Sequence, residues 1–319
     1  MGQVNQKQAA NVAIWLLLLT APVWMGWIGG YTELGSRVLV NALAAMGLNI
    51  LLGYTGVLSF GQAAYFGLGA YGTAMTIKYL VPSTMVGMVV GVLIGTAAAA
   101  LIGPLIVRLR GVYFAMVTIA FGQVFYFITF RWYTVTGGDD GVNNWYRQPI
   151  DLGFVKLDIL HSGVLFYYFI LFFFAISLLL MAFVLRSPFG RTLLAIRENE
   201  RRARFLGIPV ERHIWLSFVI SGFFCSIAGT LYALLNNFVD PRSLYWGLSG
   251  NFVIMAVLGG MRSFWGPLVG AIIFIGIQDY VSSYFPNNWE TFIGALFIVA
   301  VIFFPNGILG IIRQKVKTA

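Results

Sequence analysis

The sequence predicts an all-α protein, a polytopic transmembrane helical bundle of about ten membrane segments. Hydrophobic residues make up 59% of the 319 residues, and charged residues only 10%. The mean hydropathy is +0.84, and this apolar share exceeds that of a soluble domain. Several apolar stretches reach about 18 residues, enough to cross a hydrocarbon layer about 30 Å thick. We therefore expect a single transmembrane domain over residues 1–319, with an outer loop at 131–162 and a cytoplasmic loop at 186–212.

The expected segments follow one another along the whole chain. The first is interpreted as a transmembrane helix and not as a signal peptide, because many more spans follow it. A short apolar run that ends at two glycines is expected to be a tenth element. In order, the segments are Val12–Ile28, Val38–Leu52, Gln62–Tyr79, Met85–Val107, Val112–Phe130, Gly163–Leu185, Ile214–Leu235, Phe252–Leu258, Phe264–Val281 and Phe292–Phe304.

The distribution of charge explains the net charge of +9 and gives no reason to expect nucleic-acid binding. Fourteen of the 20 basic residues fall on one side when both termini and the 186–212 loop are placed together. An excess of Lys and Arg near span ends marks the cytoplasmic side of a membrane protein. Both termini are therefore expected in the cytoplasm. Ten crossings satisfy this placement, whereas nine would separate the termini.

Glycine spacing predicts close helix packing and one break. Gly87, Gly91 and Gly95 recur every four residues, as do Gly266 and Gly270, a spacing that lets helix backbones approach in lipid. The stretch 53–72 holds six glycines together with polar side chains. This density predicts a broken or re-entrant segment, which lipid tolerates only where the backbone is buried in protein or lines a water-filled path. A purely structural kink is the alternative interpretation.

Motifs for chemistry are weak in this chain. Gly67-x-Gly69-x-x-Gly72 matches a dinucleotide fingerprint by letter only, and the sequence contains no GxxxxGK[ST] loop for ATP. The lone Cys225 and the distant His161 and His213 form no metal or catalytic set. We expect neither an enzyme, nor a metal, nor a cofactor. Asp279 is a candidate for proton coupling, although a solvated position near a span end is the preferred interpretation.

The loop 186–212 carries seven arginines in a chain with few charges. Its apolar residues recur at helical spacing, Pro188 and Gly190 mark a turn before them, and Gly207-Ile208-Pro209 forms a helix stop after them. A short helix held between two spans is suited to insert into a groove on a soluble partner. The alternative is a basic loop that only sets the topology and touches anionic lipid.

Four segments together resemble the LivM-type permeases, which are inner-membrane subunits of ABC importers for branched-chain amino acids. The resemblance covers most of the chain after about Val38, and the combination is specific although each piece alone is weak. A departure is Asp139-Asp140 after Thr136-Gly137-Gly138, where the family commonly has proline and asparagine. The similar segments are 187–208 (SPFGRTLLAIRENERRARFLGI), 56–72 (GVLSFGQAAYFGLGAYG), 111–122 with Thr136-Gly137-Gly138, and 257–270 (VLGGMRSFWGPLVG).

The resemblance implies a multi-pass permease of the bacterial inner membrane without its own ATPase site. Its implied partners are a second, similar permease, two ATP-binding subunits and a periplasmic substrate-binding protein. The substrate would be a branched-chain or related hydrophobic amino acid. By resemblance and loop pattern, the residues expected to couple to the ATPase are Gly190, Arg191, Ala195, Ile196, Arg197, Glu198, Ala203, Arg204, Leu206 and Gly207.

The translocation pathway is expected near Ser59 and Gln62 in the broken segment, with Thr118 and Gln123 on the span that follows Val112. Two other functions remain open. Permeases for urea, amides or other small solutes look similar at this level, and an ion-coupled secondary transporter that uses Asp279 is a weaker alternative.

Overall fold

The computed structural model describes residues 12–23, 31–151, 156–157, 163–286, 291–292, 294–295, 298 and 307–310. Helices dominate this part of the chain, as predicted, and the paired strands β1 and β2 have two residues each. The long helices are α3 (Thr32–Asn49), α4 (Gln62–Met75), α5 (Thr84–Ile106), α6 (Val112–Arg131), α8 (Gly163–Arg186), α11 (Val210–Asn236), α12 (Trp246–Gly259) and α13 (Gly266–Tyr284).

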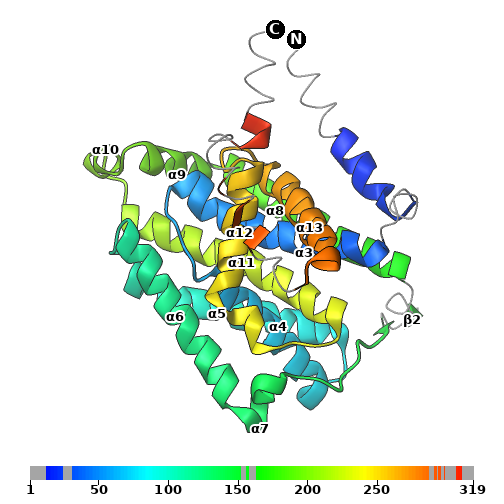
Figure 1. Ribbon diagram of the computed structural model, residues 1–319. Helices are drawn as coiled ribbons and strands as arrows, with labels where there is room; N and C mark the ends of the chain where they lie inside the picture. Colours follow the sequence, from blue (N-terminus) through cyan, green and yellow to red (C-terminus); the bar gives the residue numbers. More distant parts are fainter. Residues whose placement is uncertain are drawn as a thin grey trace.

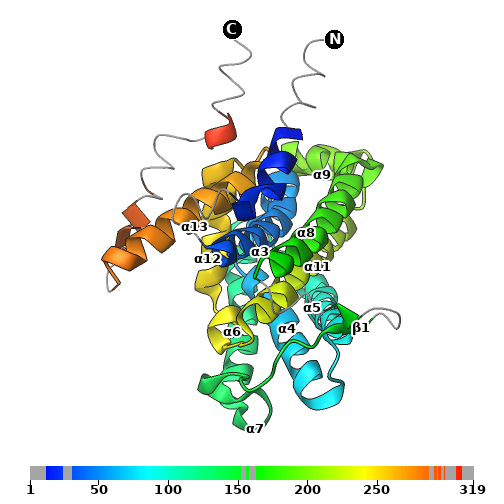
Figure 2. The same ribbon diagram turned by 90° about the vertical axis from the view of Figure 1, so that its right-hand side faces the viewer.

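The shorter elements connect these helices. Two π-helical turns, η1 and η2, extend α3 and α4. Figure 1 places α9 and α10 at the end of the bundle opposite α7, and Figure 2 agrees for α9 and α7. The bounds are η1 (Ile50–Thr55), η2 (Thr76–Leu80), α7 (Tyr133–Thr136), η3 (Gly138–Asp140), β1 (Ile150–Asp151), β2 (Lys156–Leu157), α9 (Pro188–Glu198), α10 (Glu200–Phe205) and η4 (Pro241–Leu244).

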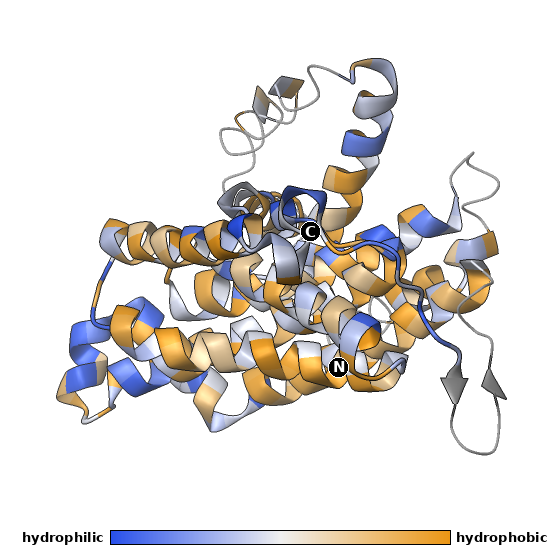
Figure 3. Ribbon diagram, turned by 90° about the horizontal axis from the view of Figure 1, so that it is seen from below, coloured by the Kyte–Doolittle hydropathy of each residue, from blue (hydrophilic) through white to orange (hydrophobic). Residues whose placement is uncertain are grey.

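Within the described residues, six helices are long and apolar enough to cross a membrane. They are 32–55, 84–106, 112–131, 163–186, 210–236 and 266–284, and α12 is a shorter apolar helix. Large apolar side chains on α5, α6 and α8 are exposed, as expected for lipid-facing surfaces. Figure 3 shows hydrophobic residues along the long helices. The count of ten and the side of the termini stay predictions, since the terminal residues and most of 292–304 lie outside the described part.

Helix α11 lies against α3, α4 and α5 and forms the centre of the bundle. The predicted role of glycine spacing is confirmed here. A Cβ atom on Gly91 of α5 would lie 2.4 Å from the carbonyl oxygen of Gly69, and one on Gly229 would lie only 1.8 Å from that of Phe66. The second pair is confirmed too, because a Cβ on Gly270 would lie 1.8 Å from the carbonyl oxygen of Met255. These backbones touch because no side chain separates them.

The predicted break is confirmed, and it is narrower than the glycine-rich stretch. The η1 turn ends at Thr55, Gly56 adopts a left-handed conformation with φ of 79°, and residues 56–61 form no helix. Helix α4 then runs without interruption through its own glycines at 67, 69 and 72. Those glycines serve helix contact, whereas only Gly56 supplies the left-handed backbone that lets the chain turn.

The structure describes the predicted outer loop over residues 131–151. Val142 pairs with Val239, and Lys78 donates a 2.9 Å hydrogen bond to the carbonyl oxygen of Asn143. The guanidinium of Arg147 lies over the Phe166 ring at 4.2 Å. The loop thus closes over the ends of α4, α8 and α11. Residues 152–155 and 158–162, including His161, lie outside the described part.

Candidate functional site

The loop after α8 turns sharply before it forms a helix. Ser187 precedes α9, and Pro188 occupies its first position, where the missing amide hydrogen costs nothing. A Cβ atom on Gly190 would lie 2.2 Å from the carbonyl oxygen of Leu185. Gly190 is therefore required for the close approach of α9 to the end of α8, which explains its position in the predicted coupling element.

Helix α9 has two distinct faces. Gly190, Leu193 and Ile196 are buried against the bundle. Arg191, Leu194, Ala195 and Glu198 share the opposite face at spacings of three and four residues, and all four are exposed. The predicted coupling residues therefore divide into an inward set that holds the helix in place and an outward set that is accessible to a partner.

Helix α10 is separate from α9, with Asn199 between them. The Asn199 side chain accepts a 2.9 Å hydrogen bond from the Arg202 amide and caps α10. At the other end Gly207 has φ of 80°, its amide donates to Arg204 O at 3.0 Å, and the Ile208 amide donates to Ala203 O at 3.2 Å. This pair of bonds is a Schellman motif. The predicted helix stop is confirmed, while the polar run divides the predicted helix into two.

An ionic cluster joins α10 to two spans. The Arg110 Nε atom donates to both carboxylate oxygens of Glu200, at 2.9 and 2.8 Å. Arg204 donates to Glu200 at 3.1 Å and to Glu211 at 2.7 Å. Because Arg110 precedes α6 and Glu211 belongs to α11, the cluster holds α10 between these helices. Its side chains are between 32% and 57% exposed, so each pair contributes modestly, on the order of 1 kcal/mol.

Arg197 points from α9 toward the bundle interior. Its guanidinium donates a hydrogen bond to the carbonyl oxygen of Gly53 in η1. Its Cγ would lie only 2.8 Å from a Cβ atom on Gly56, so the side chain passes directly over the start of the break. Partial burial and the nearby Arg262 lower the pKa of Arg197, and the guanidinium still remains charged at neutral pH. Arg197 therefore ties the loop helix to the broken segment.

The broken segment leads into a buried polar cluster. The Phe60 amide donates to Thr118 Oγ1 at 3.2 Å, and the Ala63 amide donates to Ser249 Oγ at 2.8 Å. Ser59 Oγ accepts from the Gly61 amide at 3.3 Å, and the Gln62 side-chain amide donates to it at 3.4 Å. The side chains of Ser59, Gln62, Thr118 and Ser249 are all fully or almost fully buried.

Helix α4 begins level with the middle of the long apolar helix α5 and not with its end. Its Tyr65 carbonyl lies beside Gly95 of α5, and residues 95–106 continue α5 for about 16 Å toward the end where α9 lies. Ser249 belongs to the first turns of α12, so the starts of α4 and α12 lie side by side. Helix N-termini carry unsatisfied amide hydrogens and a partial positive charge. This arrangement provides an apolar setting with a local preference for negative charge.

Three of the four predicted pathway residues meet in this cluster. Ser59, Gln62 and Thr118 lie together, and the Gln62 Oε1 atom is buried without a hydrogen-bond partner among the described residues. Gln123 is more than one helical turn beyond Thr118, on a different face of α6, and no hydrogen bond joins it to the cluster. Ser249 was missed, although the Ser-Gly-Asn run at 249–251 interrupts an otherwise apolar helix and marks the place.

Asp279 and His213 both have structural partners. Asp279 Oδ1 accepts a 2.9 Å hydrogen bond from the Tyr31 hydroxyl and lies 3.9 Å from the Arg37 guanidinium. The His213 ring stacks on Phe189 with centroids 5.7 Å apart. Neither residue belongs to the polar cluster by any described contact, and the described residues contain no group of ligands suited to a metal ion.

Known proteins are similar to this chain over both the loop with α9 and α10 and the polar cluster. A family model described as "Branched-chain amino acid transport system / permease component" matches residues 31–301. The chain is 27% identical to the high-affinity branched-chain amino acid transport system permease proteins LivM of Salmonella typhimurium and Escherichia coli K12, over 94% of this chain and 75% of each relative. It is also 27% identical to a probable branched-chain amino acid transport permease protein LivH of Methanocaldococcus jannaschii, over 89% of this chain and 93% of that protein. No solved structure matches significantly.

The family match extends from the start of α3 to beyond α13, and so includes the broken segment, the polar cluster and the loop with α9 and α10. The resemblance to LivM-type permeases is confirmed by matches that run almost the full length of the chain. On this basis the chain belongs to the family of permease components of branched-chain amino acid transport systems.

Proposed function

We propose that the chain passes branched-chain or related hydrophobic amino acids through the bacterial inner membrane as one permease subunit of an ABC importer. The family match and the names of the LivM and LivH relatives support this substrate class. The spanning helices support a multi-pass membrane location. With positive charge concentrated in the 186–212 loop, we place that loop and both termini in the cytoplasm.

In this proposal the complex contains a second, similar permease, two ATP-binding subunits and a periplasmic substrate-binding protein. ATP binds to the separate subunits, and this chain acts without a cofactor or enzymatic site of its own. The outward face of α9 and the end of α10 support docking of an ATPase subunit. Phe205 and Leu206 project there with 90% and 75% of their surfaces exposed, next to the Schellman turn. Such apolar exposure beside arginines suits insertion into a partner groove.

The link between Arg197 and Gly53 is the observation that carries the proposed mechanism. A push on α9 reaches η1 through this hydrogen bond and through the contact of Arg197 with Gly56. Because residues 56–61 form no helix, the break can change its backbone angles while the packed helices on either side move as rigid bodies. Closure of the ATPase dimer would thereby shift the start of α4 and alternate the access of the polar cluster to the two sides.

We further propose that the polar cluster lies on the translocation pathway. The adjoining starts of α4 and α12 would attract the carboxylate of an amino acid, as helix N-termini do for anions. The free Oε1 atom of Gln62 offers an acceptor for the ammonium group. The carboxylate and the ammonium group of one amino acid would thus both bind near the start of α4. The surrounding apolar residues suit a hydrophobic side chain.

Reconstitution tests the function directly. Proteoliposomes that contain this chain, the second permease and both ATPase subunits are expected to accumulate radiolabelled leucine only with internal ATP and external binding protein. Urea or an amide offered in place of leucine tests the alternative solute class. Uptake by this chain alone, driven by an ion gradient, would refute the proposal.

The pathway is tested by removing single hydroxyls from the cluster. Ser249→Ala leaves the Ala63 amide without its partner, and Thr118→Val does the same for the Phe60 amide. Each loss is expected to lower leucine uptake about tenfold, as an unmade buried hydrogen bond costs about 1–3 kcal/mol. Thr96→Val is the control, because the Thr96 hydroxyl donates only to Val92 of its own helix. Equal effects of all three variants would place the pathway elsewhere.

The ion-coupled alternative depends on Asp279. Since Asp279 already bonds Tyr31 and lies near Arg37, we assign it a role in holding the start of α3 beside α13. Asp279→Asn keeps an acceptor for the tyrosine and is expected to retain ATP-driven uptake. Loss of uptake in a variant that assembles normally and hydrolyses ATP would favour proton coupling.

A further inference from the structure

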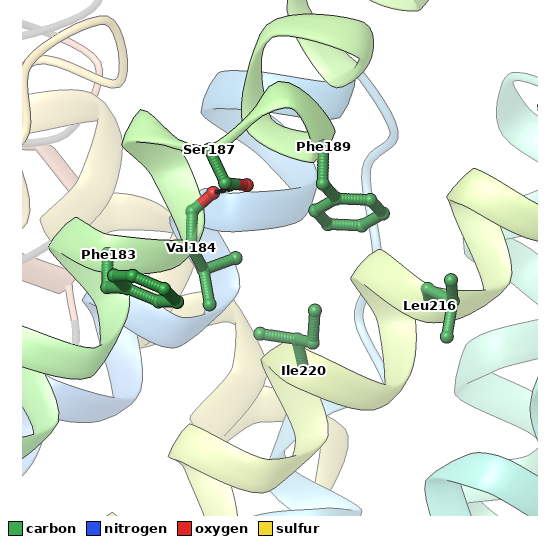
Figure 4. A pocket seen from close by; sticks show the side chains of 6 residues that line it. All are labelled: Phe183, Val184, Ser187, Phe189, Leu216 and Ile220. Carbon is green, nitrogen blue, oxygen red and sulfur yellow. Dashed lines mark hydrogen bonds between the residues drawn. The ribbon is translucent and has the colours of Figure 1, made fainter.

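An apolar groove opens between the end of α8 and the first half of α11. It has a volume of about 260 Å³ and is lined by Phe183, Val184, Ser187, Phe189, Leu216 and Ile220. Figure 4 shows these side chains gathered around one opening, with Phe189 contributed by the loop helix α9. Ser187 is the single polar lining residue, and its hydroxyl donates a 2.7 Å hydrogen bond to Val184 O. The groove therefore offers its occupant an apolar surface.

The groove continues a lipid-facing stripe on α8. Phe172, Ile176, Leu179 and Phe183 follow at spacings of three and four residues, and all are exposed. Phe183 belongs to both the stripe and the groove, and 77% of its surface is exposed. An apolar chain that lies along this stripe reaches the groove without leaving a hydrophobic surface.

Two arginines stand at the loop end of the groove. Arg186 is the last residue of α8, and Arg212 lies in the first turn of α11, one turn before the lining residue Leu216. Both are exposed, and neither forms an ion pair with any described residue. The neighbouring carboxylate, Glu211, is already engaged by Arg204. The arrangement thus places free positive charge about 6 Å along the helix from an apolar cleft.

The charge beside the groove selects among occupants. A lipid offers both an apolar chain for the groove and an anionic headgroup for the two arginines. An acyl chain is slender enough to enter, and the phosphate of its headgroup forms strong hydrogen bonds with guanidinium groups.

We propose that this groove binds one anionic phospholipid, with an acyl chain against Phe183, Phe189 and Ile220 and the headgroup phosphate on Arg186 and Arg212. Because α9 supplies Phe189, the bound lipid packs directly against the loop helix. The site is independent of the substrate and depends only on the chain lying in a bilayer.

The charge requirement is tested on the assembled complex in nanodiscs, with phosphatidylglycerol in a phosphatidylcholine background and native mass spectrometry as readout. The double variant Arg186→Gln/Arg212→Gln is expected to retain the anionic lipid about 25-fold less well, a factor of about five for each arginine. Arg201→Gln/Arg202→Gln is the matched control, since it removes the same charge from exposed positions on α10. Equal lipid loss in both variants would overturn the proposal.

The groove requirement is tested by Ile220→Trp, which fills the cleft and leaves every arginine in place. It is expected to reduce phosphatidylglycerol retention as strongly as the double arginine variant, while Leu179→Trp on the exposed stripe leaves retention unchanged. Size-exclusion chromatography of each complex confirms assembly. If Ile220→Trp instead weakens the ATPase subunits and keeps the lipid, the groove receives a partner side chain and the lipid proposal is wrong.

Discussion

The guanidinium of Arg197 on the loop helix α9 donates a hydrogen bond to the main-chain oxygen of Gly53, 144 residues earlier in the chain. The acceptor lies at the end of the first long helical span, immediately before the chain breaks at Gly56. A charged side chain from an extramembrane loop thus holds the point from which the chain enters the buried polar cluster. Any displacement of α9 must therefore move η1, stretch this bond or reorient Arg197.

Removal of the Arg197 side chain is expected to separate ATP hydrolysis from transport. A hydrogen bond from a charged group contributes about 1.5–3 kcal/mol, so Arg197→Ala should lower leucine moved per ATP hydrolysed by at least about tenfold. Arg108→Ala is the control, since it removes the same charge from an exposed position outside α9 and α10. The measurement is the ratio of uptake to phosphate release in the reconstituted complex. A ratio equal to that of the wild type would show that Arg197 carries no coupling.

Neutralising Glu200 is expected to loosen α10. Glu200→Gln weakens the bonds to Arg110 and Arg204, and amide hydrogen exchange at Ala203 should accelerate about fivefold, equivalent to about 1 kcal/mol for exposed pairs. Glu198→Gln serves as control because Glu198 forms no ion pair with a described residue. The same exchange is measured at raised salt concentration, which screens ion pairs. If neither salt nor Glu200→Gln changes the exchange rate, the caps alone hold α10 in place.

Alanine at Gly91 is expected to destabilise the bundle, whereas alanine at Gly276 is not. A Cβ atom on Gly91 would lie 2.4 Å from both Gly69 O and Thr73 Oγ1. A Cβ atom on Gly276 would have no neighbouring described atom within 4 Å. Overpacking of a tight contact costs about 1–3 kcal/mol. Thermal unfolding in detergent should show a lower midpoint for Gly91→Ala and an unchanged or slightly higher one for Gly276→Ala. Equal midpoints would mean that α4 and α5 separate at little cost.

Stability should depend on pH through Asp240, which lies in the loop between α11 and η4. Burial raises the pKa of the Asp240 carboxyl above its ordinary value, against the opposing effect of Arg242. A raised pKa in the folded state means that stability is highest below the ordinary pKa and falls as the pH rises through the folded value. Asp240→Asn should therefore raise the unfolding midpoint at pH 7 and flatten its dependence on acid pH. Glu198→Gln, at an exposed carboxylate on α9, is the control. A destabilised Asp240→Asn would show that the charge is needed.

Some features follow from neighbouring residues and can be predicted from the amino-acid sequence. Apolar runs of sufficient length predict spanning helices because each hydrocarbon-embedded backbone must satisfy its own hydrogen bonds. The end of α10 depends on the left-handed backbone of one residue, Gly207. The close contact between α5 and α4 at Gly91 depends on the absence of a side chain. The break at residues 56–61 likewise follows from local glycine and serine.

Other features depend on how distant segments pack. The hydroxyl of Ser249 reaches the Ala63 amide across 186 residues, and α12 extends beyond its predicted apolar run, back to Trp246. Thr118 and Gln123 lie on different faces of α6, so Thr118 faces the break and Gln123 does not. Arg197 turned inward although arginines on either side of it remain exposed.

The sequence alone determined that the chain forms apolar helices, where one of them breaks and which loop offers a capped helix, since these properties arise from hydrophobicity and backbone freedom within a few residues. Only the tertiary structure decided which polar groups meet inside the bundle and which arginine binds the break. Those contacts join residues far apart in the chain, and their geometry depends on the rotation and depth of each packed helix.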